Sequence, residues 1–121
     1  MSITSKYFKE SEFGKCSPAC SLQDMKQSTM DLLDKARELA GIPFVLNSAF
    51  RSVEHEKKMG RDGKGAHTLG MAVDIRCQSD YNRFKVIEAL LATGFRRIGI
   101  AKTYIHADNS TSHSQNVAWM Y

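Results

Sequence analysis

The sequence predicts a single α+β domain in which two long helices are combined with several short strands. The chain has 121 residues, of which 42% are hydrophobic and 25% charged, values close to those of average globular proteins. A chain of this length can bury most of its apolar surface in one core, so we expect one domain over residues 1–121. Apolar residues recur at helical spacing in two segments and form short runs in five others.

The first helix is predicted over residues 21–40. Ser21, followed three positions later by Asp24, matches the pattern of a capping box at its start. Gly41 and Pro43 are expected to end it, because neither continues a helix. The apolar positions at helical spacing, expected to face the core, are Met25, Thr29, Leu32, Ala36 and Leu39.

A second helix is predicted to begin after Ser79, a common N-cap residue, and to stop at Gly94. Its expected core face carries Phe84, Ile87 and Leu91.

Short apolar runs between polar or turn residues predict the strands. They are residues 44–47, 71–77, 97–100, 104–107 and 117–121. Residues 61–70 contain three glycines, which is too many for a helix interior and suits a loop that wraps around a site. Trp119 and Tyr121 in the last strand are expected to complete the core.

Charge and hydropathy narrow the class of function. Lysine and arginine outnumber aspartate and glutamate by 17 to 13, and the basic residues are spread over several segments, which argues against a nucleic-acid interface. A mild positive charge also suits an anionic polymer such as a bacterial cell wall. No apolar run approaches the roughly 20 residues of a membrane span, and the first residues lack the apolar core of a signal peptide. We therefore expect a monomer that is made in the cytoplasm and binds neither nucleic acid nor a membrane.

The cysteines are Cys16, Cys20 and Cys77, an odd number in a chain without a recognisable export signal. We expect no disulfide framework and at least one free thiol. Cys16 and Cys20 have no second Cys or His pair near them in the sequence, so we interpret them as incidental rather than as a metal site.

The residues that point to chemistry are His67, Asp74 and His106. Catalytic zinc takes three ligands from imidazole nitrogens and carboxylate oxygens and keeps a fourth position for water. Asp74 and His106 lie on predicted strands, each on the polar face opposite apolar neighbours, and Gly70 lets the chain turn back between His67 and Asp74. The alternative is structural: the histidine is a solvated loop residue, and Asp74 bonds neighbouring backbone amides.

An ordered set of motifs resembles the M15 peptidases, and most closely their compact D-Ala-D-Ala carboxypeptidase-like branch, which is common in phages. The resemblance runs from about Tyr7 to Tyr121. The motifs are Phe50-Arg51-Ser52, His67-x-x-Gly70-x-Ala72-x-Asp74-Ile75, Gly94-Phe95, Ile98-Gly99, Ile105-His106-x-Asp108, and an aromatic tail at Trp119 and Tyr121.

The resemblance implies a fold of the Hedgehog/D-Ala-D-Ala carboxypeptidase type, in which helices pack on a small antiparallel sheet that bears the metal. It implies Zn²⁺ bound by His67, Asp74 and His106, and cleavage of peptidoglycan stem peptides at D-Ala-D-Ala or at L-Ala-D-Glu. Arg51 matches a family arginine that faces the site, where it would stabilise an oxyanion or bind a substrate carboxylate; the alternative is a surface ion pair. Ser52 and Tyr104 are candidate substrate-binding residues, although Tyr104 has packing as its alternative.

The general base is left open by two departures from the family pattern. Several branches have Glu three residues before the last zinc histidine and others have His two before it, but here these positions are Thr103 and Tyr104. Asp108 is the first candidate, because it shares a strand face with His106; its alternative is to orient a ligand imidazole. Gly65 stands where the family often has Ser. His113 is either a solvated loop residue or an acid–base group.

Two functions are consistent with the sequence. The first is a zinc peptidase of peptidoglycan, a phage or prophage lysis enzyme that reaches the wall after holin-type release. The second is a non-catalytic, zinc-containing module that binds cell-wall peptides.

Overall fold

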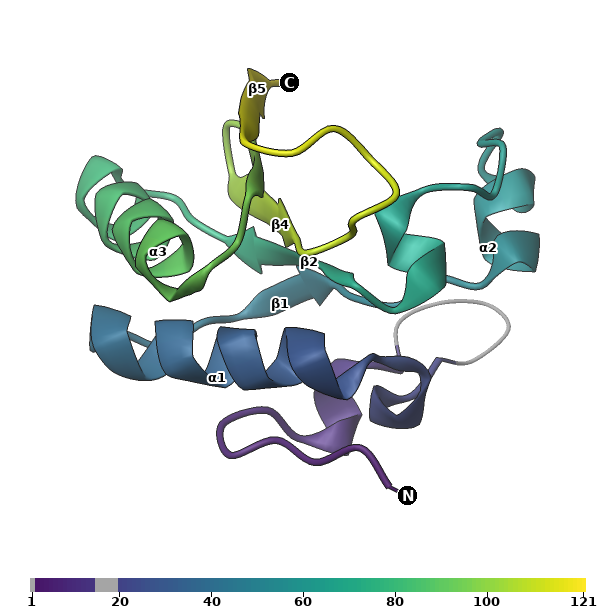
Figure 1. Ribbon diagram of the computed structural model, residues 1–121, viewed down its shortest axis with the longest axis horizontal. Coiled ribbons are helices and arrows are strands. Elements are labelled where there is room, and N and C mark those ends of the chain that lie inside the picture. The colour runs from purple at the N-terminus through teal and green to yellow at the C-terminus, as the bar shows by residue number, and fades with distance from the viewer. Residues whose placement is uncertain (1, 15–19) are drawn as a thin grey trace.

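A computed structural model describes residues 2–14 and 20–121 of the chain. Its strands are β1 (Leu46–Ser48), β2 (Ala72–Arg76), β3 (Arg97–Ile100), β4 (Tyr104–Asp108) and β5 (Val117–Met120). Its helices are α1 (Gln27–Ala40), α2 (Val53–Lys58) and α3 (Asp80–Thr93), with 3-10 helices η1 (Glu10–Glu12), η2 (Leu22–Asp24) and η3 (Ala66–Leu69). The strands form one sheet in the order β1-β2-β4-β3-β5 (Figure 1).

The sheet confirms the predicted α+β fold, with helices packed on a small sheet. Strands β1, β2, β4 and β3 pair antiparallel, whereas β5 pairs parallel to β3, so the sheet is mixed at this edge. Asp74 of β2 lies opposite His106 of β4, which lies opposite Gly99 of β3, which in turn lies opposite Trp119 of β5. One row of residues therefore crosses four strands.

The two faces of the sheet differ in chemistry because side chains alternate along each strand. Val73 and Ile75 of β2 and Ile105 and Ala107 of β4 are fully buried in the hydrophobic core. Helices α1 and α3 pack against each other and cover this face (Figure 1). The polar residues of the same strands, which include Asp74 and His106, therefore lie on the opposite face.

The first predicted helix is divided into η2 and α1. Ser21 and Asp24 form the predicted capping box, but the backbone is extended at Met25 and Lys26 before α1 begins. The backbone N–H of Lys26 donates instead to the carbonyl of Gly70, 2.8 Å away, a contact across the fold that the local sequence pattern does not contain. Gly41 ends α1 in the left-handed conformation, as predicted.

The predicted boundaries of α3 are correct, but its predicted core face is only partly correct: of the three predicted residues, Ile87 packs against the core. Ser79 caps the helix and Gly94 ends it with φ 119°. The buried residues are Val86, Ala89 and Leu90, whereas Phe84 and Leu91 are 63% and 46% exposed. Helix α3 therefore turns Val86, Ala89 and Leu90 to the core, and the larger Phe84 lies at the surface.

Cys77 is free and buried, as expected for at least one thiol. Cys20 is disulfide-bonded, so the expectation that the cysteines form no bridge is wrong at this residue. Cys16 lies outside the described residues. No helix in the described ranges is long and apolar enough to cross a membrane.

Candidate metal centre

Three elements bring His67, Asp74 and His106 together on the polar face of the sheet. His67 comes from η3, Asp74 from β2 and His106 from the facing position on β4. Gly70 ends η3 with φ 72°, a left-handed conformation that reverses the chain between His67 and Asp74. The predicted glycine-rich loop thus contains a short helix that carries the first candidate ligand.

The spacing of the three side chains fits a metal ion. Oδ1 of Asp74 lies 3.1 Å from Nδ1 of His106 and 3.4 Å from Nε2 of His67. One donor atom from each residue lies within 4.8 Å of the others. Tetrahedral zinc with bonds of about 2.0–2.1 Å places its ligand atoms roughly 3.3 Å apart. The spacing to Asp74 therefore matches zinc without rearrangement.

Hydrogen bonds fix which nitrogen of each histidine faces the centre. Nδ1 of His67 lies 2.6 Å from the backbone carbonyl of Ala49, which can only accept, so Nδ1 carries the proton. Nε2 of His106 lies 2.6 Å from Oδ2 of Asp108 and donates to that carboxylate. The remaining nitrogens, Nε2 of His67 and Nδ1 of His106, therefore direct lone pairs at Asp74. Partners of this kind orient the histidine ligands of protein metal sites.

These converging lone pairs require a cation. In the described part of the chain, Nε2 of His67 is buried and has no hydrogen-bond partner. A neutral imidazole nitrogen and a carboxylate oxygen that face each other at 3.1 Å repel unless a proton or a metal lies between them. The donor set of two nitrogens and one oxygen suits zinc better than calcium or magnesium, which prefer oxygen ligands.

The electrostatics of the metal-free cluster also favour positive charge. Burial alone would raise the pKa of Asp74, but its interactions with the imidazoles of His106 and His67, which can hold a proton between these groups when no metal is bound, outweigh burial and keep the pKa well below its ordinary value. Burial lowers the pKa of His106, but hydrogen bonds to Asp108 and Asp74 outweigh this effect and raise the pKa overall. The cluster thus keeps its carboxylate ionised and stabilises a cation beside it.

Asp108 occupies the position expected of an orienting residue. Its side chain is fully buried, Oδ2 accepts from His106, and Oδ1 accepts from Nε of Arg97 at 2.8 Å and from the backbone N–H of Ser110 at 3.2 Å. Both oxygens are engaged. Of the two roles predicted for Asp108, this geometry favours orientation of a ligand imidazole over proton transfer.

Arg51 lies beside the metal cluster and lines the same cavity. Its Nη2 lies 3.9 Å from Oδ2 of Asp74, and its Nε lies 3.3 Å from Oε1 of Glu56, without hydrogen-bond geometry. Glu56 is buried and also accepts from Arg61 at 2.7 Å. One carboxylate therefore holds two guanidinium groups at the same cavity.

Ser52 and Tyr104, the two candidate substrate-binding residues, lie in different settings. The hydroxyl of Ser52 accepts the backbone N–H of His55 and caps α2. Tyr104 lines the cavity of about 270 Å³ that contains the metal cluster, and its ring lies 5.4 Å from that of Tyr121.

Trp119 and Tyr121 line this cavity, so the expectation that they complete the core is wrong. Tyr121 is 66% exposed, and the ring of Trp119 lies 5.3 Å from that of His106. Gly99 makes this arrangement possible: a Cβ there would lie 2.8 Å from atoms of both aromatic rings.

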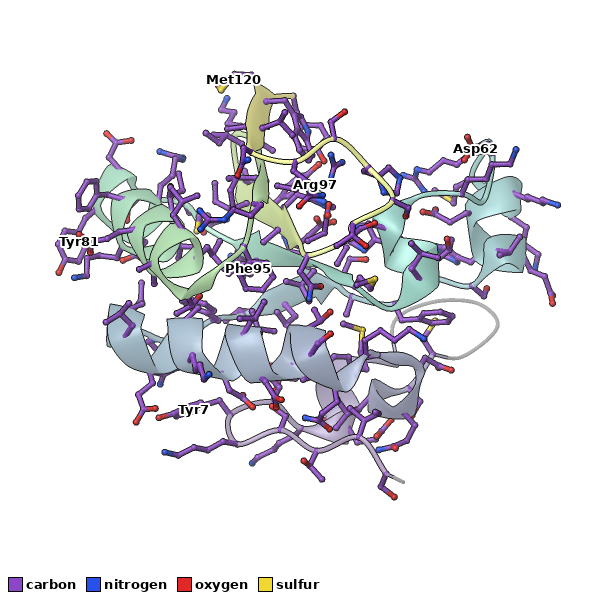
Figure 2. All side chains as sticks on the ribbon, in the orientation of Figure 1. Tyr7, Asp62, Tyr81, Phe95, Arg97 and Met120 are labelled. Atoms are coloured by element: carbon purple, nitrogen blue, oxygen red, sulfur yellow. The ribbon has the colours of Figure 1, made fainter. Side chains whose placement is uncertain are left out.

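Arg97 is a site residue that the sequence reasoning missed. It binds Asp108, donates through Nη1 to the carbonyl of Ser114 at 2.7 Å, and places its guanidinium 5.0 Å from the centre of the Trp119 ring. Figure 2 shows it between the sheet and the loop that follows β4. Arg97 and Gly99 are two residues apart on β3 and share one face of the strand, which is the feature of the sequence that could have indicated Arg97. Its contacts could not be predicted in this way, because they depend on the order of the strands in the sheet.

A family model described as Peptidase M15 matches residues 6–108. These residues include all three candidate ligands, Arg51 and Asp108, whereas the loop after β4 and β5 lie beyond the match. No curated protein matches the chain.

Proposed function

The chain belongs to the peptidase M15 family, and we propose that it is a zinc-dependent hydrolase of peptidoglycan stem peptides. The observation that carries the proposal is the convergence of His67 Nε2, His106 Nδ1 and Asp74 Oδ1, with both imidazole tautomers fixed from outside the centre. When bound, zinc would polarise a carbonyl oxygen and lower the pKa of water in the site.

The residues around the metal cluster would have separate roles in binding the substrate and in orienting the metal ligands. Arg51 is placed to donate to the oxygen that becomes negative when the scissile carbonyl is attacked, or to bind a carboxylate of the substrate. Asp108 holds His106 in one tautomer and one orientation. Tyr104 and Trp119 would form one wall against the peptide.

The charge of the cavity supports an anionic peptide substrate. Three arginines, Arg51, Arg61 and Arg97, line it together with Asp74 and Asp108. Asp74 would be neutralised by the metal, and Asp108 is already paired with Arg97. Stem peptides carry free carboxylates, which guanidinium groups bind well. Both the D-Ala-D-Ala and the L-Ala-D-Glu bond lie beside such a carboxylate. The biological role that we propose is that of a phage or prophage lysis enzyme.

Removal of Asp74 is expected to abolish metal binding. The purified protein should contain about one zinc ion per chain, and Asp74→Ala should contain far less, because a catalytic zinc site has three protein ligands. Metal content by plasma mass spectrometry measures this. Asp31→Ala, an exposed carboxylate on α1, is the matched control and should keep its zinc. A wild-type protein with far less than one zinc ion per chain, and with the same zinc content after Asp74→Ala, would contradict the metal assignment.

The zinc-loaded protein is expected to cleave purified muropeptides. Mass spectrometry of the products should show loss of one D-Ala or a split between L-Ala and D-Glu, and the mass identifies the bond. The second candidate is a binding module, which is favoured by the engagement of both Asp108 oxygens and by Thr103 and Tyr104 at the usual base positions. Binding of muropeptides without any cleavage, at full zinc loading, would favour it.

A further inference from the structure

Hydrolysis of a peptide bond needs a group that can accept and return a proton, and the metal cluster does not supply one. Among the described residues that line the cavity, the carboxylates are Asp74 and Asp108. Asp74 is a candidate ligand, and Asp108 is fully buried with both oxygens engaged. Tyr104 and Tyr121 also line the cavity, and a phenol serves there as a hydrogen-bond donor rather than as a base.

His113 lines the same cavity and is not part of the metal cluster. It lies in residues 109–116, which arch from the end of β4 towards η3 before returning to β5 (Figure 1). Imidazole is the side chain best suited to take and give a proton near neutral pH. His113 therefore places a group suited to proton transfer in the cavity that contains the metal cluster.

Hydrogen bonds on both sides of His113 hold the loop. Gln115 Nε2 donates to the carbonyl of Ser110 at 2.7 Å and to that of His113 at 2.9 Å. Arg97 donates to the carbonyl of Ser114 at 2.7 Å. The loop is therefore fastened to β3 and to itself, which fixes the backbone position of His113.

The ring of His113 is anchored by one nitrogen. Its Nδ1 lies 2.8 Å from Oγ of Ser110, a fully buried residue whose backbone N–H donates to Asp108. In the described residues, Nε2 of His113 has no hydrogen bond to a protein group. The anchored nitrogen fixes the ring and leaves Nε2 for a ligand or water.

We propose that His113 is the general acid–base residue of this enzyme, an inference that rests on the function proposed above. Nε2 takes a proton from the attacking water as the water oxygen bonds to the carbonyl carbon. It then gives that proton to the amine nitrogen as the C–N bond breaks, so the imidazole is regenerated and no other reactant is consumed.

The test compares His113→Ala and His113→Gln with the wild type on muropeptides at full zinc loading. General acid–base groups contribute about 10²–10⁴-fold to rate, so kcat should fall at least ~100-fold in both variants. KM and zinc content should stay close to wild type, because His113 is outside the metal cluster. Added imidazole should restore part of the turnover of His113→Ala. Thr111→Ala, an exposed change in the same loop, should keep wild-type kcat and reports any effect of imidazole itself.

The outcomes separate the two proposals. A wild-type protein that binds zinc but cleaves nothing would overturn the proposed function. With an active wild type, unchanged kcat in His113→Gln would overturn the role of His113. Loss of zinc in either variant, or loss of turnover without any rescue by imidazole, would also overturn it, because both point to a structural contribution.

Discussion

Replacement of Asp108 by Ala is expected to weaken zinc binding and to destabilise the fold together. The change would leave Nε2 of His106 and the guanidinium of Arg97 without their buried partner. Removal of one partner of a buried ion pair costs about 3 kcal/mol of unfolding free energy, and loss of a hydrogen-bond partner behind a metal ligand lowers metal affinity roughly 10–100-fold. Urea unfolding of the metal-free protein and competition with a chelator measure the two effects.

Two further variants serve as controls for Asp108→Ala. Asp80→Ala removes the carboxylate of an exposed Asp–Arg pair of the same length, 2.8 Å, and should change neither quantity appreciably. Asp108→Asn keeps an acceptor for Arg97 and should lie between Asp108→Ala and the wild type. A variant that lost turnover while keeping wild-type stability and zinc affinity would contradict the orienting role and restore Asp108 as the base.

The candidate metal ligands could be predicted from the sequence because they belong to an ordered set of motifs that resembles a known family; their spacing alone left a structural role open. His67, Gly70 and Asp74 lie on one short segment, and the alternation on β2 and β4 correctly places Asp74 and His106 on a shared face. The groups that fix the tautomers could not be predicted in the same way. Ala49 contributes a backbone carbonyl, which has no sequence signature, and Arg97 reaches Asp108 only because β3 pairs with β4.

The helices show the same limit. Periodicity and capping residues predicted where α3 begins and ends, since these features are local. The face of α3 that is buried depends on where α1 lies, and the break before α1 depends on the contact between Lys26 and Gly70. Similarly, the sequence predicts Trp119 in the core, but the parallel pairing of β5 with β3 puts Trp119 opposite Gly99 and at the cavity.

The positions of Trp119 and Tyr121 in the lining of the cavity depend on the absence of a side chain at Gly99. The backbone of Gly99 has no positive φ, so a larger residue is excluded by contact rather than by conformation. A Cβ there would lie 2.8 Å from Cε2 and Nε1 of Trp119 and from Cε2 of Tyr121. Gly99 pairs with His106 as well, so a displaced Trp119 would also lose its contact with a candidate ligand.

Gly99→Val is therefore expected to displace Trp119 and to reduce turnover more than zinc binding. Inserting methyl groups into a packed contact costs about 1–3 kcal/mol of stability. Because Trp119 would move away from its position beside the peptide, we expect kcat/KM to fall at least tenfold. This fall corresponds to a loss of about 1.4 kcal/mol in transition-state binding. Trp119 is the one tryptophan of the chain, so its fluorescence reports the displacement directly. Gly65→Ala is the steric control, because a Cβ at Gly65 would meet nothing within 4 Å and should leave the spectrum unchanged. An unshifted Trp119 spectrum and full activity in Gly99→Val would show that the wall adapts and does not set the shape of the cavity.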